Sequence, residues 1–259
     1  MTGNDHGLIL QDRDRTFLAE LQKFRWVDRE QAKRIAGFTS TTRVNTRMLA
    51  LVRAGLLSRL FVGTISSGRK AVYGLSAKGA ALVGLEHPPK RHKHTDTVAT
   101  DLFVEHQLQL NSVVLAAQAV PDAFRTAARI DHWQTFHHAV STDTLLIPDG
   151  LLVAKVPDGF RAMFLEVDLG TETHRVWRKK TESYLRFARS GEFERRFHFS
   201  QFRVLVVARS QVRTANIRST ISKLSDKISW FSTFEQIHRD GFWAPVWLRP
   251  TGEQVHSLL

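Results

Sequence analysis

Cysteine is absent from this chain of 259 residues, and long apolar runs are absent as well. Without cysteine the protein cannot form disulfides, thiolate zinc sites or a cysteine nucleophile, which fits a reducing cytoplasm. No run approaches the roughly 20 apolar residues of a membrane-spanning helix. Residues 1–15 also lack the apolar core of a secretion signal. The sequence therefore predicts a soluble cytoplasmic protein with no membrane partner.

Acidic residues are scarce in the first third of the chain. The formal net charge is +12 at pH 7. Residues 1–97 carry 17 Lys and Arg against 8 Asp and Glu, whereas residues 98–259 carry 20 against 17. Three quarters of the positive excess thus lies in the first third. Such a surface attracts polyanions, and we expect double-stranded DNA as the partner.

The first third of the chain shows a pattern of three helices followed by a β-hairpin and a short helix. Asp28 is placed to cap the second helix, and Gly55 is placed to end the third. Two apolar segments, 56–62 and 70–75, then flank a turn rich in Gly and Ser. This order is typical of a winged helix-turn-helix, which we assign to residues 1–86.

The third helix of such a domain enters the major groove, and the tip of the hairpin reaches a phosphate or the minor groove. The alternative is a winged helix that makes only protein contacts, and the charge excess favours DNA. The predicted DNA-binding residues are those exposed on the third helix and at the hairpin tip: Thr42, Arg43, Asn45, Thr46, Arg47, Arg69 and Lys70.

A basic, Pro-containing stretch at residues 87–97 is interpreted as a linker to a second domain at residues 98–259. Residues 202–208 are almost continuously apolar, as in a strand that is covered on both faces. We predict a mixed sheet flanked by helices and an α+β chain overall. The predicted strands are 131–136, 145–155, 161–168, 202–208 and 230–233, and the predicted helices are 98–119, 171–190 and 214–227.

Three carboxylates follow the apolar segments of the second domain. Glu166 and Asp168 are two residues apart on one predicted strand, so their side chains point the same way. If Asp149 lies on the neighbouring strand, all three converge at one edge of the sheet. Such a cluster repels itself unless it surrounds a divalent cation, so we expect these three residues to bind Mg²⁺ or Mn²⁺. The alternative is a pair of acidic strand ends at the surface.

Lys180 and Tyr184 lie on the helix that follows these carboxylates. The residues of one helical stripe are Thr173, Val176 or Trp177, Lys180, Tyr184 and Phe187. This stripe places Lys180 on the apolar face of that helix, where it can reach Glu166 or Asp168. There its ammonium would orient an attacking water or stabilise charge on phosphorus. The alternative is a lysine whose stem packs while its head reaches solvent. Tyr184 either donates a hydrogen bond to a phosphate or only packs.

These motifs resemble those of known proteins. The series Pro148-Asp149, Glu166-Val167-Asp168 and Lys180 is similar to the PD-(D/E)xK nuclease motif. The chain as a whole resembles the replication-relaxation family of plasmid and mobile-element proteins, in the stretch 166–172 and in the spacing of Lys180 and Tyr184. The resemblance implies a winged helix joined to a restriction-endonuclease-like domain. The chain departs from the nuclease pattern at Asp168, which occupies the usual position of the strand lysine.

The leading hypothesis is a DNA-binding protein of a plasmid or mobile element with a metal-dependent DNA endonuclease domain. In it Asp149, Glu166 and Asp168 hold the metal, and Lys180 and Tyr184 assist catalysis. One alternative is a replication or transcription regulator whose second domain dimerises or holds DNA without catalysis. Another is an adaptor that recruits replication or conjugation machinery. An ammonium of Lys180 close to the carboxylates would favour the enzyme, and one in solvent would favour the regulator.

Overall fold

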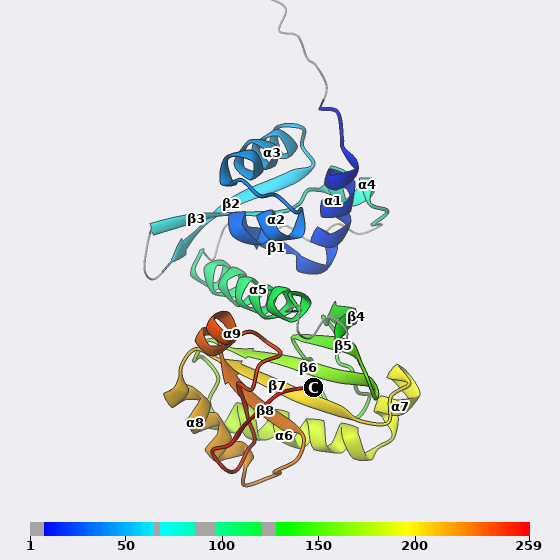
Figure 1. Ribbon diagram of the computed structural model, residues 1–259, viewed down its shortest axis with the longest axis vertical. Helices are drawn as coiled ribbons and strands as arrows, with labels where there is room; N and C mark the ends of the chain where they lie inside the picture. The colour runs from blue at the N-terminus through cyan, green and yellow to red at the C-terminus, as the bar shows by residue number, and fades with distance from the viewer. Residues whose placement is uncertain (1–7, 65–67, 86–96, 121–127) are drawn as a thin grey trace, which may run out of the picture. The chain divides into compact units, whose positions relative to one another are not determined.

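The computed structural model of the protein describes residues 8–64, 68–85, 97–120 and 128–259. The chain divides into two compact units, residues 1–111 and 112–259. The first contains a three-stranded sheet and the second a seven-stranded mixed sheet, each accompanied by helices (Figure 1). The predicted α+β class is confirmed. Within the described residues, no helix is both long and apolar enough to cross a membrane.

The first unit has the predicted order of three helices followed by a hairpin. Its strands are antiparallel in the order β1-β3-β2, so that β3 is central. The short strand β1 was not predicted. Its elements are α1 (Asp12–Phe24), β1 (Trp26–Asp28), α2 (Arg29–Ile35), α3 (Thr41–Arg53), β2 (Leu57–Thr64), β3 (Gly68–Leu75) and α4 (Ala77–Leu82).

Local sequence signals start the helices of this unit and fix one strand contact. The side chain of Asp28 accepts a hydrogen bond from the Gln31 amide and caps α2, as predicted. Ser40 caps α3 through the amide of Arg43. At Gly74 of β3, a Cβ atom would lie 2.9 Å from the carbonyl oxygen of Arg25. Only glycine therefore lets β1 approach β3 so closely.

Helix α5 (Thr97–Gln118) contains the division between the two units. Its residues Val104 and Leu108 share an apolar cluster with Val62 and Val72 of the hairpin. Asn111 donates hydrogen bonds to backbone carbonyls at the end of α1 and in β1. These contacts place the first half of α5 in the first unit, whereas we expected a boundary in the linker. That linker lies outside the described residues, apart from its last residue.

The second unit is built on a sheet with the order β10-β9-β8-β7-β6-β5-β4. Strands β6, β7 and β8 are parallel, and the other neighbours are antiparallel. The elements are β4 (Arg129–Thr135), β5 (Gly150–Val156), β6 (Gly159–Asp168), α6 (His174–Arg189), α7 (Glu192–Phe197), β7 (Phe202–Ala208), α8 (Gln211–Ile221), β8 (Ser229–Thr233), α9 (Phe234–Asp240), β9 (Trp247–Leu248) and β10 (Val255–His256).

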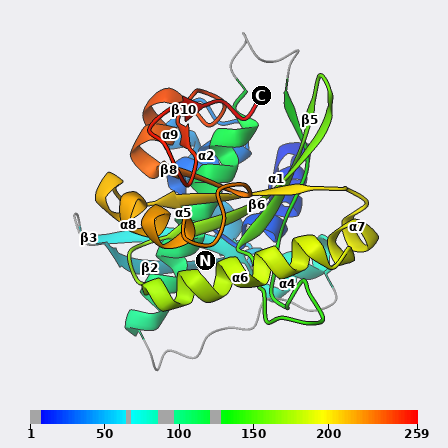
Figure 2. The ribbon, with the colours of Figure 1, turned by 90° about the horizontal axis from the view of Figure 1, so that it is seen from below.

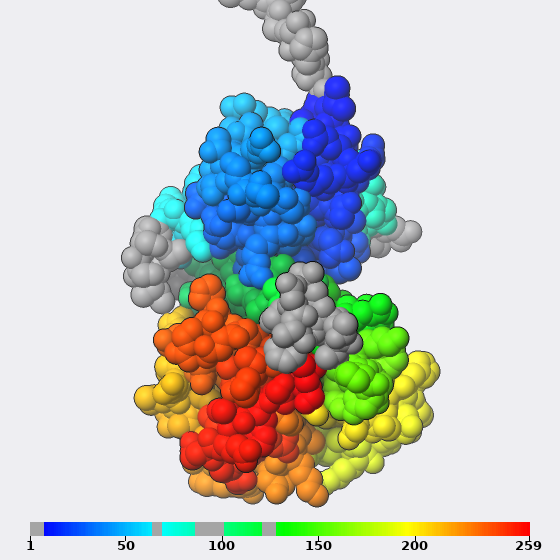
Figure 3. Space-filling view, in the orientation of Figure 1, coloured from blue at the N-terminus to red at the C-terminus, as the bar shows by residue number. Residues whose placement is uncertain are grey.

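Helices α6 and α8 pack on the same face of this sheet (Figures 1 and 2). Between α6 and the sheet lies an aromatic core around Phe164, which contacts the rings of Tyr184, Phe187, Phe193 and Phe202. Strand β7 coincides with the predicted strand 202–208 and lies at the centre of the sheet. The C-terminal residues, red in Figure 3, lie on the surface beside the orange residues of α9.

Candidate functional site: a lysine among carboxylates

The pairing of β5 with β6 brings two of the predicted carboxylates together. The strands are antiparallel with Gly150 opposite Leu165, so Asp149, just before β5, lies opposite Glu166. An oxygen of Asp149 accepts a hydrogen bond of 2.7 Å from the amide of Val167. The predicted strand 145–155 was thus too long at its start, because the chain enters the sheet only at Gly150. The expected juxtaposition of Asp149 with the β6 strand is confirmed.

Glu166 is completely buried, and both of its oxygens accept hydrogen bonds from α6. The ammonium of Lys180 lies 2.8 Å from Oε2, and the hydroxyl of Tyr184 lies 2.5 Å from Oε1. Burial and, to a smaller extent, the nearby charge of Asp149 raise the pKa of Glu166 to about 7, against the opposing charge of Lys180. Glu166 therefore titrates near neutral pH. The ammonium of Lys180 stabilises the charged form of its carboxylate.

Lys180 bridges two carboxylates and is only 19% exposed. Its ammonium also lies 2.9 Å from Oε1 of Glu172, in the loop between β6 and α6. Burial alone would lower the pKa of Lys180, but the charges of Glu166, Glu172 and Asp149 raise it above its usual range. The lysine is therefore a fixed cation. The expectation that it finds a carboxylate partner is confirmed.

The buried face of α6 differs slightly from the predicted stripe. Trp177, Tyr184 and Phe187 are buried, whereas Val176 is 40% exposed. Of the two residues that we considered for this turn, Val176 is therefore not part of the apolar face. Trp177 fills that position, because successive helical residues are about 100° apart and only one of them can face the sheet. Lys180 remains on the edge of the buried face, and the Trp177 ring lies 5.1 Å from its ammonium.

Asp168 points to the same side of β6 as Glu166 but belongs to a second cluster. Arg213 of α8 binds it through two hydrogen bonds of 2.7 Å, one to each oxygen. The indole of Trp177 and the amide of Gly170 also donate to it. Burial would raise the pKa of Asp168, but the bonds from Arg213, Trp177 and Gly170 lower it. All of its good acceptor directions are therefore occupied within the protein.

The predicted three-carboxylate metal site is not assembled in this arrangement. Among the described residues, no group of three or more His, Asp or Glu side chains is placed to hold a metal ion. The reason is local, since Asp168 is bound by Arg213, and Glu166 is bound by Lys180 and Tyr184. In this arrangement the carboxylates are paired with protein donors, and binding of Mg²⁺ or Mn²⁺ stays a prediction. A protein ammonium supplies the positive charge instead.

Two residues of these clusters were missed by the sequence interpretation. Glu172 is the second ion-pair partner of Lys180, and its Oε2 is buried without a hydrogen-bond partner among the described residues. Arg213 lies 45 residues beyond Asp168. The spacing of Glu166, Asp168 and Glu172 gave a weak signal for the first. Nothing local indicates the second, because α8 meets β6 only in the folded sheet.

The predicted DNA-binding residues fall into two groups. Thr42, Arg43, Asn45 and Thr46 are exposed along α3, as expected of a reading helix. Arg47 instead turns inward. Its guanidinium pairs with the buried Asp14, with Nε at 2.8 Å from Oδ1, and donates to the carbonyl of Ile9. The structure thus places Arg47 in the framework that holds α3 against α1.

The hairpin residues are also only partly available. Lys70 forms an ion pair of 2.7 Å with Asp28, the residue that caps α2, although its side chain remains 48% exposed. Arg69 is exposed and donates weakly to the Phe61 carbonyl at 3.4 Å. The turn at residues 65–67 lies outside the described residues. Of the seven predicted residues, Arg43 and Arg69 are therefore the cations best presented to a ligand.

Comparison with known proteins agrees with the resemblance. The family model described as replication-relaxation matches residues 18–200, and the chain therefore belongs to the replication-relaxation family. That membership associates the protein with replication or relaxation of plasmid or mobile-element DNA. No curated protein and no solved structure matches the chain.

Proposed function

We propose that this protein binds double-stranded DNA of a plasmid or mobile element through a winged helix in its first unit. Its second unit, with a fold of the PD-(D/E)xK type, serves as a non-catalytic module that holds DNA or dimerises. The protein would thereby act as a regulator of replication or relaxation. Family membership supports the process, and the exposed polar face of α3 supports the mode of contact.

The observation that carries the non-catalytic assignment is the saturation of Glu166 and Asp168. Each of their four oxygens accepts at least one hydrogen bond from a protein group. Both side chains are fully buried, with no exposed area. A divalent ion prefers oxygens that it shares with water and substrate phosphate. To bind here it would have to displace Lys180, Tyr184 or Arg213, and each displacement would break a buried hydrogen bond.

The DNA contact is tested by band shifts with a duplex library and the full chain. Arg43→Ala should weaken binding strongly, whereas Arg53→Ala, at the other end of α3, should have less effect because the first turns of a reading helix contact the bases. Equal affinity of the Arg43 variant and wild type would remove α3 as the reading helix. The oligomeric state, measured by light scattering with and without DNA, shows whether the second unit dimerises.

A metal-dependent endonuclease is the second candidate, and three observations favour it. Lys180 lies 2.8 Å from Glu166, close enough to share its charge as we expected of a nuclease lysine. Among the described residues, one oxygen of Glu172 has no hydrogen-bond partner. Asp149 lies opposite Glu166 on the neighbouring strand. In this function Glu172 would take the place we assigned to Asp168. The ion would be Mg²⁺ or Mn²⁺, held by carboxylates released from their present partners.

A plasmid-nicking assay separates the two candidates. Supercoiled plasmid is incubated with the full chain and Mg²⁺ or Mn²⁺, beside Glu166→Gln and the exposed control Lys179→Met. The regulator predicts no nicking by any of the three proteins. Nicking by wild type and Lys179→Met that is lost in Glu166→Gln would establish the endonuclease and overturn the non-catalytic assignment.

A further inference from the structure

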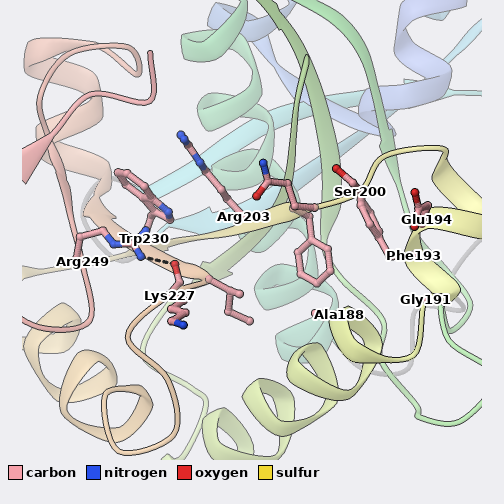
Figure 4. A pocket seen from close by; sticks show the side chains of 12 residues that line it. Ala188, Gly191, Phe193, Glu194, Ser200, Arg203, Lys227, Trp230 and Arg249 are labelled. Atoms are coloured by element: carbon pink, nitrogen blue, oxygen red, sulfur yellow. Dashed lines mark hydrogen bonds between the residues drawn. The ribbon is translucent and has the colours of Figure 1, made fainter. Parts of the chain in front are cut away.

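A cavity of about 480 Å³ lies at the amino ends of β7 and β8 (Figure 4). It is bordered by the end of α6, the helix α7 and Arg249, which directly follows β9. The register of β6 with β7 runs from Ala162 opposite Phe202 to Asp168 opposite Ala208. The cavity is therefore at the opposite end of these strands from Glu166 and Asp168. It is a separate site, within the volume of roughly 300–1,000 Å³ that ligand pockets occupy.

Two arginines and a tryptophan form one side of this cavity. The guanidinium carbon of Arg203 lies 4.6 Å from the ring centre of Trp230, and that of Arg249 lies 4.4 Å from it. Figure 4 shows Trp230 between the two arginines, with Lys227 below them. Such stacking fixes the planes of both guanidinium groups at little further cost in entropy. The cations are therefore positioned before any ligand arrives.

Backbone carbonyls, and not carboxylates, hold these two arginines. Arg203 donates to the carbonyl of Leu258 at 3.1 Å, and Arg249 donates to the carbonyls of Asp226 and Lys227. In the described part of the chain, neither makes an ion pair with a carboxylate. Each uses one nitrogen of its guanidinium for these bonds. The remaining N–H groups keep their capacity to bind an anion.

The charge around Arg203 is incompletely balanced. Burial, together with the nearby charges of Arg161 and Arg249, lowers the pKa of Arg203 to about 10. The nearby acid Asp158 is already paired with Arg161 at 2.6 Å. Glu194 contributes one exposed carboxylate to the wall. An added anion would relieve the repulsion between the arginines.

We propose that this cavity binds a phosphate group through Arg203 and Arg249, with Lys227 as a third cation. Two fixed guanidinium planes suit the tetrahedral, multiply charged phosphate, which accepts paired hydrogen bonds. The source of the phosphate is the backbone of a DNA strand, a step that rests on the proposed function. Free phosphate is the other source of the same chemistry.

The test uses the full chain and a double variant, Arg203→Gln with Arg249→Gln. The control, Arg186→Gln with Lys223→Gln, removes the same charge from exposed positions outside the cavity. Affinity for a 20-nucleotide duplex and for its single strand is measured between about 50 and 200 mM salt. Loss of one or two phosphate contacts should lower the slope of log K against log salt by about 0.7–0.9 for each contact. The control should keep the wild-type slope.

Calorimetric titration with inorganic phosphate, in the absence of DNA, measures phosphate binding by the cavity. This measurement does not depend on the proposed function. Phosphate binding by wild type and control, but not by the double variant, supports the site even if the chain binds no DNA. The same result with unchanged DNA slopes assigns the site to free phosphate. Equal behaviour of double variant and control in both measurements overturns the proposal. Thermal unfolding checks the fold, and Lys227→Gln, exposed at the rim, provides a milder variant should the double variant unfold.

Discussion

The α3 surface of the first unit and the α6 face of the second use positive charge in opposite ways. On α3, Arg43 is exposed to solvent, where a cation costs little stability and is available to a ligand. On α6, Lys180 is held between Glu166 and Glu172, where it compensates buried charge. Positive charge is thus exposed on α3 and compensates buried charge on α6. Four changes test or sharpen this comparison.

Lys180→Met should have the largest effect, because it leaves the charge of Glu166 buried without its cation. Removal of one partner of a buried pair costs about 3–5 kcal/mol, so we expect a loss of that size in the free energy of unfolding at pH 8. At pH 5 the loss should be smaller, because Glu166 is then protonated. Lys179→Met, on the exposed side of α6, is the control and should stay within about 0.5 kcal/mol. Urea unfolding of both variants at both pH values measures this, and equal stability of the two variants would contradict it.

Glu166→Gln should change how stability depends on pH. The pKa of Glu166 rises from the usual 4.5 to about 7 on folding, so the folded state keeps a proton that the unfolded chain releases. Wild-type stability should therefore fall as pH rises from about 4.5 to 7, by about 1.4 kcal/mol per pH unit from this residue. The glutamine variant should lack this component. Parallel curves for the two proteins would show that the pKa is not raised.

Arg47→Ala should reduce stability more than DNA affinity, because its partner Asp14 is buried. A lost hydrogen bond to a charged group costs about 1.5–3 kcal/mol, and we expect that range in chemical unfolding. Arg15→Ala, exposed on α1, provides the control. A stable Arg47 variant that fails to bind DNA would instead indicate that Arg47 contacts DNA.

Arg43→Ala should show the smallest change in stability and a clear change in binding. Because the side chain is exposed, unfolding should shift by no more than about 0.5 kcal/mol. DNA affinity should fall by about 1–3 kcal/mol if Arg43 contacts a base, and the salt slope should fall by about one if it contacts a phosphate. Band shifts at several salt concentrations distinguish the two cases. Destabilisation without loss of binding would reverse the roles assigned to Arg43 and Arg47.

Much of the fold could be predicted from local patterns in the sequence. Helix caps such as Asp28, and the apolar run of β7, are signals that residues carry by themselves. The short elements β1, α7, α9, β9 and β10 were missed. Each has seven residues or fewer and depends on its neighbours in the folded sheet. Strand β1, for example, forms only because Gly74 of a distant strand admits it.

The candidate site was predictable where it follows the periodicity of one element. Alternation along β6 placed Glu166 and Asp168 on one side, and the helical period placed Lys180 near them. The identity of the partners was not predictable. Arg213 and Asp14 reach Asp168 and Arg47 from elements far along the chain, and their pairings decide which charges remain available. The sequence shows the carboxylates but not the cations that pair with them, and the metal site stays a prediction.

The enclosure of Glu166 by Lys180 and Tyr184 has a consequence for how this family can diverge. Loss of one of these three side chains leaves a buried partner without its hydrogen bond or opposite charge. The stability effects of substitutions at the three positions are therefore not additive. A relative can lose the ion pair at least cost in stability when the acid and the lysine are replaced together, for example by two apolar residues. Positions 166 and 180 should therefore covary in an alignment of relatives, whereas position 179 should vary independently of both.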